Sequence, residues 1–161
     1  MDIREYQDED WKDVWCILND VFSTGDTFPN SPDTSENEAW KYWIEQTKYT
    51  FVAKHNGKIV GSYYIKNNQL GLGSHIANAG YVVIVDSRGE GVGLSLAKHS
   101  LEFAKHKGYL AMQFNLVVST NRSSIGLWKK LDFSVIGTIP EAFNHKIKGL
   151  VDAYIMYRRL A

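Results

Sequence analysis

Apolar residues recur at helical spacing in several stretches of the chain. Between Trp11 and Phe22 they repeat every three or four positions, which predicts an amphipathic helix with Asp8 as its candidate cap. The sequence Ser35-Glu36-Asn37-Glu38 has the form of a capping box and predicts a second helix over 35–47. The same spacing predicts a helix over 94–107, ended by Gly108, and a short one over 120–132.

The remaining apolar runs are rich in β-branched and aromatic residues and predict strands. Residues 50–66 form two such runs around Asn56-Gly57, a strong hairpin signal. The run 109–119 is apolar almost throughout, and we expect it to be buried on both faces. Further strands are predicted over 2–6, 75–85, 133–139 and 151–160, and a loop over 23–34. This order predicts an α+β fold, with a mixed, largely antiparallel sheet flanked by helices on both faces.

Composition narrows the class of protein. The formal net charge is zero, from 18 basic and 18 acidic residues, which removes the electrostatic signature of a nucleic-acid binder. No apolar run is long enough to span a membrane, and the polar N-terminus lacks the core of a signal peptide. The single cysteine, Cys16, lies in the first predicted helix, where we expect a buried structural thiol. We expect one cytoplasmic domain over 1–161 that binds no metal.

The stretch 84–100, IVDSRGEGVGLSLAKHS, carries the first chemical signal. Three glycines, Gly89, Gly91 and Gly93, occupy every second position between a predicted Val-rich strand and a predicted helix. Arg88 comes directly before them. Unpaired N–H groups at a helix start bind phosphate oxygens, and glycines let those oxygens approach. A glycine-rich turn without a ligand explains the glycines alone about as well. The dinucleotide fingerprint fails, because Leu94 and Leu96 occupy its last position, and P-loop spacing is absent. The pattern present is R-x-x-G-x-G.

Two motifs together resemble the GCN5-related N-acetyltransferase (GNAT) superfamily. Residues 82–109 resemble its acetyl-CoA-binding segment, and residues 119–137 resemble the segment that follows. The resemblance implies that the Gly-rich turn holds a pyrophosphate and that the edge of the preceding strand pairs with the pantetheine arm. The cofactor-binding residues it implies are Val83, Ile84, Val85, Arg88, Gly89, Glu90, Gly91, Val92, Gly93, Leu94, Asn121, Ser124 and Trp128.

The chain departs from the family pattern at the acid and the base. Trp128 stands where many relatives carry a tyrosine proposed to protonate the leaving thiolate, and an indole N–H is no useful acid. No Asp or Glu lies between Gly71 and Val85, where many relatives carry a glutamate. His75 and Asp26 are candidate bases, each with a structural role as its alternative, and an ordered water is a third.

Asn78 and Asn115 interrupt apolar strands, where a buried amide must find partners for its donors and its acceptor. Either they are satisfied structural amides, or they point into the opening of the sheet and position an acceptor. The segments 25–29, 74–83, 113–121 and 137–143 resemble fungal acetyltransferases of L-azetidine-2-carboxylate and their bacterial relatives. This resemblance implies substrate recognition by Asn78 and Asn115 and a catalytic role for Asn121. We expect Asn78 to be catalytic as well, and Asp26 and Phe28 to line the acceptor site.

The sequence therefore predicts an acetyl-CoA-dependent N-acetyltransferase for a small amine or a proline-like imino acid. Acetylation of a protein N-terminus or lysine is the alternative within the enzyme class, and a non-catalytic acyl-CoA sensor is the alternative outside it. Neither nucleic acid nor a membrane is expected as a partner. The second helix and the last strands could form a homodimer interface, although core packing explains their apolar residues equally well.

Overall fold

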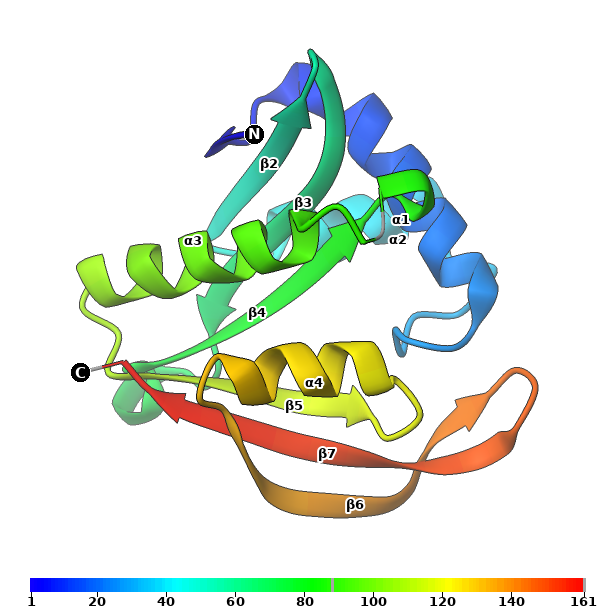
Figure 1. Ribbon diagram of the computed structural model, residues 1–161, viewed down its shortest axis with the longest axis vertical. Coiled ribbons are helices and arrows are strands. Elements are labelled where there is room, and N and C mark those ends of the chain that lie inside the picture. Colours follow the sequence, from blue (N-terminus) through cyan, green and yellow to red (C-terminus); the bar gives the residue numbers. More distant parts are fainter. Residues whose placement is uncertain (88, 161) are drawn as a thin grey trace.

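The computed structural model describes residues 1–87 and 89–160, and Arg88 lies outside them. Seven strands form one sheet in the order β1-β2-β3-β4-β5-β7-β6, and only the β4–β5 pair is parallel (Figure 1). The strands are β1 (Asp2–Glu5), β2 (Tyr49–His55), β3 (Lys58–Asn67), β4 (Ile76–Val83), β5 (Ala111–Val118), β6 (Ser134–His145) and β7 (Gly149–Arg159). The mixed, mostly antiparallel sheet predicted from the sequence is confirmed.

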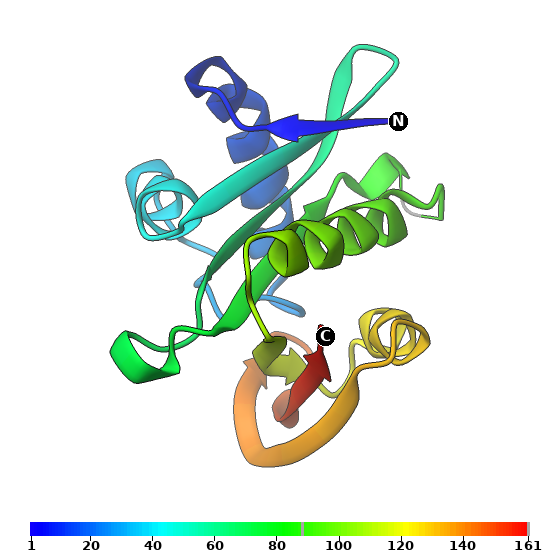
Figure 2. The same cartoon turned by 90° about the vertical axis from the view of Figure 1, so that its left-hand side faces the viewer.

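Four α-helices cover the two faces of this sheet, as Figure 2 shows from the side. They are α1 (Trp11–Thr24), α2 (Glu36–Trp40), α3 (Val92–His106) and α4 (Arg122–Lys130). Helices α1 and α2 lie on one face, where Val14 and Leu18 pack with Val52 of β2. Helices α3 and α4 lie on the other, where Leu96 and Trp128 belong to the larger core cluster.

Several local predictions are confirmed by the backbone. Ser35 Oγ accepts from the Glu38 N–H (3.1 Å) and Glu38 Oε1 accepts from the Ser35 N–H (3.3 Å), which completes the capping box of α2. That helix passes directly into a π-helical turn, Lys41–Glu45. Asn56 and Gly57 both have positive φ, 52° and 77°, as a tight turn between β2 and β3 requires.

Three local predictions are wrong. Asp8 does not cap α1, because it begins a 3-10 turn, Asp8–Asp10, that precedes the helix. Cys16 is exposed, since Val14, Ile17 and Leu18 take the buried face of α1 and leave position 16 outside. Strand β5 is buried on both faces only at its ends, Ala111–Met112 and Val117–Val118, whereas in its middle Gln113 is half-buried and Asn115 is exposed. An apolar run does not reveal whether a second layer of helix will reach the far face.

The parallel pair at the centre of the sheet is short. Strands β4 and β5 pair only at Ile76–Ala111 and Ala77–Met112, although each strand is eight residues long. Beyond Ala77 the two strands diverge, so β5, β7 and β6 turn away from β1–β4 (Figure 1). The resulting V-shaped divergence exposes main-chain groups in the middle of the sheet. No helix in the described part of the chain combines the length and apolar content needed to cross a bilayer.

Candidate functional site

The glycine-rich turn lies at the start of α3, beside the open end of this divergence. Gly89 and Gly91 have positive φ, 86° and 81°, and a Cβ built at either would meet nothing within 4 Å. The Ser95 N–H donates to Gly91 O (3.0 Å) as the helix begins, so the N–H groups of Gly93 and Leu94 precede it. Open space, free N–H donors and the positive helix end are the features that favour an anion at such a turn. The expected cation, Arg88, lies outside the described residues.

Three elements converge on Gly93. A Cβ built there would lie 4.0 Å from Leu127 Cδ2 of α4 and 4.0 Å from Val83 Cγ2 of β4. Gly93 itself is half-buried between them. The fold thus joins the glycine turn, the end of β4 and one face of α4, which are distant in the sequence.

Strand β4 ends at Val83, two residues before the end of the predicted run at Val85. The Ile84 N–H donates to Val60 O (2.8 Å), and Val85 begins a 3-10 turn. Because main-chain groups alternate in direction along an antiparallel strand, those of Val83 and Tyr81 point the other way, toward β5. These two residues therefore offer the free strand edge. Sequence reasoning missed Tyr81, although counting back by two from Val83 would have found it.

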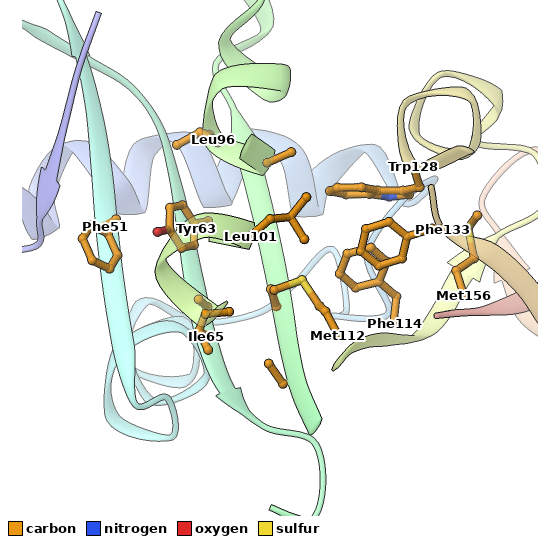
Figure 3. Packing of buried hydrophobic residues seen from close by; sticks show 14 of the residues in the cluster. Phe51, Tyr63, Ile65, Leu96, Leu101, Met112, Phe114, Trp128, Phe133 and Met156 are labelled. Carbon is orange, nitrogen blue, oxygen red and sulfur yellow. The ribbon is translucent and has the colours of Figure 1, made fainter. Parts of the chain in front are cut away.

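Trp128 lies in an aromatic cluster that fills the divergence on the α3 and α4 face. Its ring centroid is 4.9 Å from that of Tyr81 on β4 and 4.5 Å from that of Phe114 on β5. Phe133 stacks on Phe114 at 4.7 Å beneath it (Figure 3). Trp128 is only 6% exposed. Trp128 therefore bridges the two diverging strands, and its indole ring packs in the hydrophobic core.

Asn121 is the N-cap of α4. Its Oδ1 accepts hydrogen bonds from the Ser124 N–H (3.4 Å) and from Ser123 Oγ (3.3 Å). The side chain of Asn121 therefore caps the start of α4. Ser124 thereby lies in the first turn of α4, half-buried.

The two strand asparagines belong to one hydrogen-bonded cluster on the α1 and α2 face. Asn78 Nδ2 donates to Gln113 O (3.0 Å), which ties β4 to β5 where the strands begin to diverge. Gln113 Nε2 donates to Asn115 Oδ1 (2.9 Å), and Asn115 Nδ2 donates to Asn68 Oδ1 (2.7 Å). We call these four residues the amide cluster. Asn78 is 8% exposed, whereas Asn115 faces solvent.

The candidate acceptor-site residues of the 23–34 loop make contacts within the fold. Phe28 packs on Phe22 of α1 (5.5 Å between centroids) and on Trp43 (6.1 Å), so it joins the core under α1. Asp26 Oδ1 accepts from Thr24 Oγ1 (2.5 Å), which is a local contact at the end of α1. His75 precedes β4 at the end where β4 and β5 are paired, and the structure does not bring it to the open end.

The sequence analysis missed a set of two tyrosines and a lysine beside the amide cluster. Tyr64 of β3 lies on Gly80 of β4, where a Cβ would be 2.7 Å from Tyr64 Cζ. The hydroxyls of Tyr64 and Tyr42 are 3.3 Å apart, and Lys66 Nζ lies 5.8 Å from the Tyr64 ring centroid. Burial raises the pKa of both tyrosines, so both hydroxyls remain protonated donors at neutral pH. The alternation Tyr64-Ile65-Lys66 was the available signal.

The comparisons with known proteins agree with this geometry. Residues 11–133 match the model of the acetyltransferase (GNAT) family. The N-acetyltransferase aca1 of Schizosaccharomyces pombe is 44% identical over 98 residues, which is 60% of this chain and 47% of aca1. SPT10 of Saccharomyces cerevisiae is 26% identical over 156 residues, 83% of this chain and 24% of SPT10. The matched region therefore spans less than half the length of either relative.

Solved structures give the same result. A GCN5-related N-acetyltransferase from Kribbella flavida superposes with a TM-score of 0.92 at 34% identity, covering 98% of this chain and 96% of that one. The structure of yncA from Salmonella typhimurium with its cofactor acetyl-CoA has a TM-score of 0.86 at 21% identity, covering 100% and 94%. The latter likeness concerns the fold alone. The family match and the Kribbella structure lead to one conclusion: the chain belongs to the acetyltransferase (GNAT) family.

Proposed function

We propose that this chain is an acetyl-CoA-dependent N-acetyltransferase that acetylates a small molecule, with a proline-like imino acid as the acceptor class. One observation carries the proposal. The β4–β5 pair stops after two residue pairs, directly beside an open glycine turn at a helix start. That arrangement offers a strand edge and an anion site within one continuous surface, which suits a phosphate-bearing arm.

The residues present fit the cofactor. Gly89 and Gly91 leave room for a pyrophosphate, and the N–H groups of Gly93 and Leu94 are donors for it. The outward main-chain groups of Tyr81 and Val83 pair with the pantetheine arm as an added strand would. Bound acetyl-CoA supplies an acetyl group activated as a thioester. The N–H groups of this strand edge polarise its carbonyl.

The acceptor binds from the opposite face of the sheet, over the amide cluster. Asn78 Oδ1 receives no hydrogen bond from the described residues, so it accepts one from the amine and orients the nitrogen lone pair. Asn115 positions the rest of the acceptor. The exposed Asn115 opens one side of the cluster to solvent, so a water there takes the released proton.

No strong acid is required of the chain. The free thiol has an ordinary pKa of about 8.5, similar to that of a cysteine side chain, so it separates readily as the thiolate near neutral pH. This is consistent with a tryptophan at position 128. Asn121 contributes by holding α4 against the site through its cap.

The resemblance to the fungal L-azetidine-2-carboxylate enzymes supports the acceptor class, and the 44% identity to an N-acetyltransferase of Schizosaccharomyces pombe supports the reaction. The test is thiol release from acetyl-CoA with a panel of imino acids, amino acids, polyamines and N-terminal peptides. Release with imino acids alone is the expected outcome. Release with peptides would replace the acceptor class. Binding of acetyl-CoA without release across the panel would favour a sensor.

A further inference from the structure

Lys66 is placed on the acceptor side of the sheet by the alternation of β3. Its neighbour Ile65 belongs to the core cluster under α3, so Lys66 projects to the opposite face. Asn78 lies between Ala77 and Ala79, and Gln113 between Met112 and Phe114, all four in that same cluster. The two amides therefore share the face of Lys66.

The strand register brings these side chains together. Lys66 and Asn78 are Cα partners in the β3–β4 pair, and Asn78 reaches Gln113 O on β5. Asn68 follows Lys66 by two residues and accepts from Asn115. Lys66 thus borders the amide cluster directly.

The ammonium group of Lys66 lies near two aromatic rings. Its Nζ lies 5.9 Å from the Tyr42 ring centroid and 5.8 Å from that of Tyr64. The Tyr64 ring rests on Gly80, and the next residue is Tyr81, whose main chain points toward β5. The cation therefore lies beside the ring that covers Gly80 of β4.

This cation has no anionic partner among the residues that the structure describes. Across residues 1–87 and 89–160, Arg4–Asp10 is the one ion pair within 4.0 Å, and Lys66 is not part of it. The surrounding side chains add donors: the second amide hydrogens of Asn78, Gln113 and Asn115 and the protonated hydroxyl pair of Tyr42 and Tyr64. A half-buried lysine surrounded by donors and π-faces is a site for an anion.

We propose that Lys66 binds the carboxylate of the acceptor and thereby selects free α-amino or α-imino acids. The inference rests on the proposed function and refines it. In such an acid a single carbon separates the amine from the carboxylate. A carboxylate on Lys66 therefore holds the amine beside Asn78 and the free edge of β4 at Tyr81. Amines without an adjacent carboxylate lose this anchor.

The test compares an acid with its neutral amide. L-Azetidine-2-carboxylate, L-proline and L-prolinamide are assayed with the wild type, Lys66→Met and Lys66→Arg. The matched control is Lys58→Met, an exposed lysine at the far end of the same strand. We expect Lys66→Met to lower kcat/KM for the acids by about 10- to 100-fold, as for one lost hydrogen bond to a charged group, with the amide unchanged. Lys66→Arg should retain most of the activity toward the acids, and Lys58→Met all of it.

A binding measurement separates this inference from the proposed function. Calorimetric titration of L-azetidine-2-carboxylate into the protein with free CoA should show binding that Lys66→Met weakens. If no amine is acetylated but this Lys66-dependent binding persists, the proposed function fails and the carboxylate site stands. If amines are acetylated with equal loss for acid and amide in Lys66→Met, or with no loss, the carboxylate site is wrong. An absence of both turnover and acid binding in the wild type overturns both.

Discussion

The Lys146 N–H donates to Gly25 O across 3.0 Å, which joins the tip of the β6–β7 hairpin to the end of α1. Lys146 Nζ also donates to Ser23 O (3.3 Å). The hairpin belongs to the half of the sheet that diverges from β4, whereas α1 packs on the other half. These bonds therefore tie the two halves together far from the two residue pairs of β4 and β5 and from the amide cluster.

The contact between Gly25 and Lys146 requires a glycine at position 25, because of the backbone conformation there and the lack of space for a side chain. Gly25 has φ 64°, and a Cβ there would lie 2.9 Å from Lys146 Cβ. Gly25→Ala should destabilise the protein by about 1–2 kcal/mol more than Gly57→Ala, which has a comparable φ of 77° but open space around it. Urea unfolding of both variants measures the difference. Equal losses would mean that the hairpin contact contributes nothing.

The glycine turn gives a second matched pair. Gly91→Glu places a carboxylate where the phosphates are expected, and we predict at least ~100-fold weaker acetyl-CoA binding because like charges repel at the helix start. Gly71→Glu is the control, since Gly71 also has positive φ and open surroundings but lies at the opposite end of β4. Calorimetric titration with acetyl-CoA measures both variants. Unchanged affinity in Gly91→Glu would refute the phosphate assignment.

A substitution of Trp128 tests whether its indole N–H takes part in the reaction in place of the tyrosine acid of many relatives. Trp128→Phe keeps an aromatic ring against Tyr81 and Phe114 but removes the indole N–H. We expect a stability loss of about 1–3 kcal/mol from the smaller ring in a close-packed cluster, with kcat nearly unchanged. Steady-state kinetics and denaturant unfolding separate the two effects. A fall in kcat of ~100-fold or more in a folded variant would give Trp128 a part in the chemistry.

His99 of α3 predicts a pH dependence of stability. Burial lowers the pKa of His99, and its Nδ1 shares a hydrogen bond with the Tyr63 hydroxyl across 2.7 Å. As the pH falls, the imidazole of His99 is therefore protonated at a higher pH in the unfolded chain than in the folded protein. The contribution of His99 is present above the ordinary histidine pKa of about 6.5 and is lost as the pH falls toward its lower folded value.

The variant His99→Gln isolates this effect, because glutamine can accept from Tyr63 but does not titrate. We expect the loss of unfolding free energy between about pH 8 and about pH 5 to be smaller in His99→Gln than in the wild type. Urea unfolding at both pH values measures it. An identical pH dependence in the two proteins would exclude His99 as its source.

Much of the fold follows from local sequence signals. Helical spacing from Trp11 to Phe22, the capping box at Ser35 and the turn at Asn56-Gly57 each involve residues close in the chain, and the structure has each of them. Cys16 shows the limit of this approach. A helical pattern gives the angular position of a face only approximately, so a residue at its border can lie on either side.

The candidate site divides in the same way. The sequence by itself determined the family and the glycine turn, because close approach of a backbone requires glycines at fixed spacing. Only the tertiary structure decided where β4 and β5 diverge, which main-chain groups of Tyr81 and Val83 remain free, and that Lys66 stands beside Asn78. Strand register and splay depend on packing between residues far apart in the chain, and no local pattern encodes them.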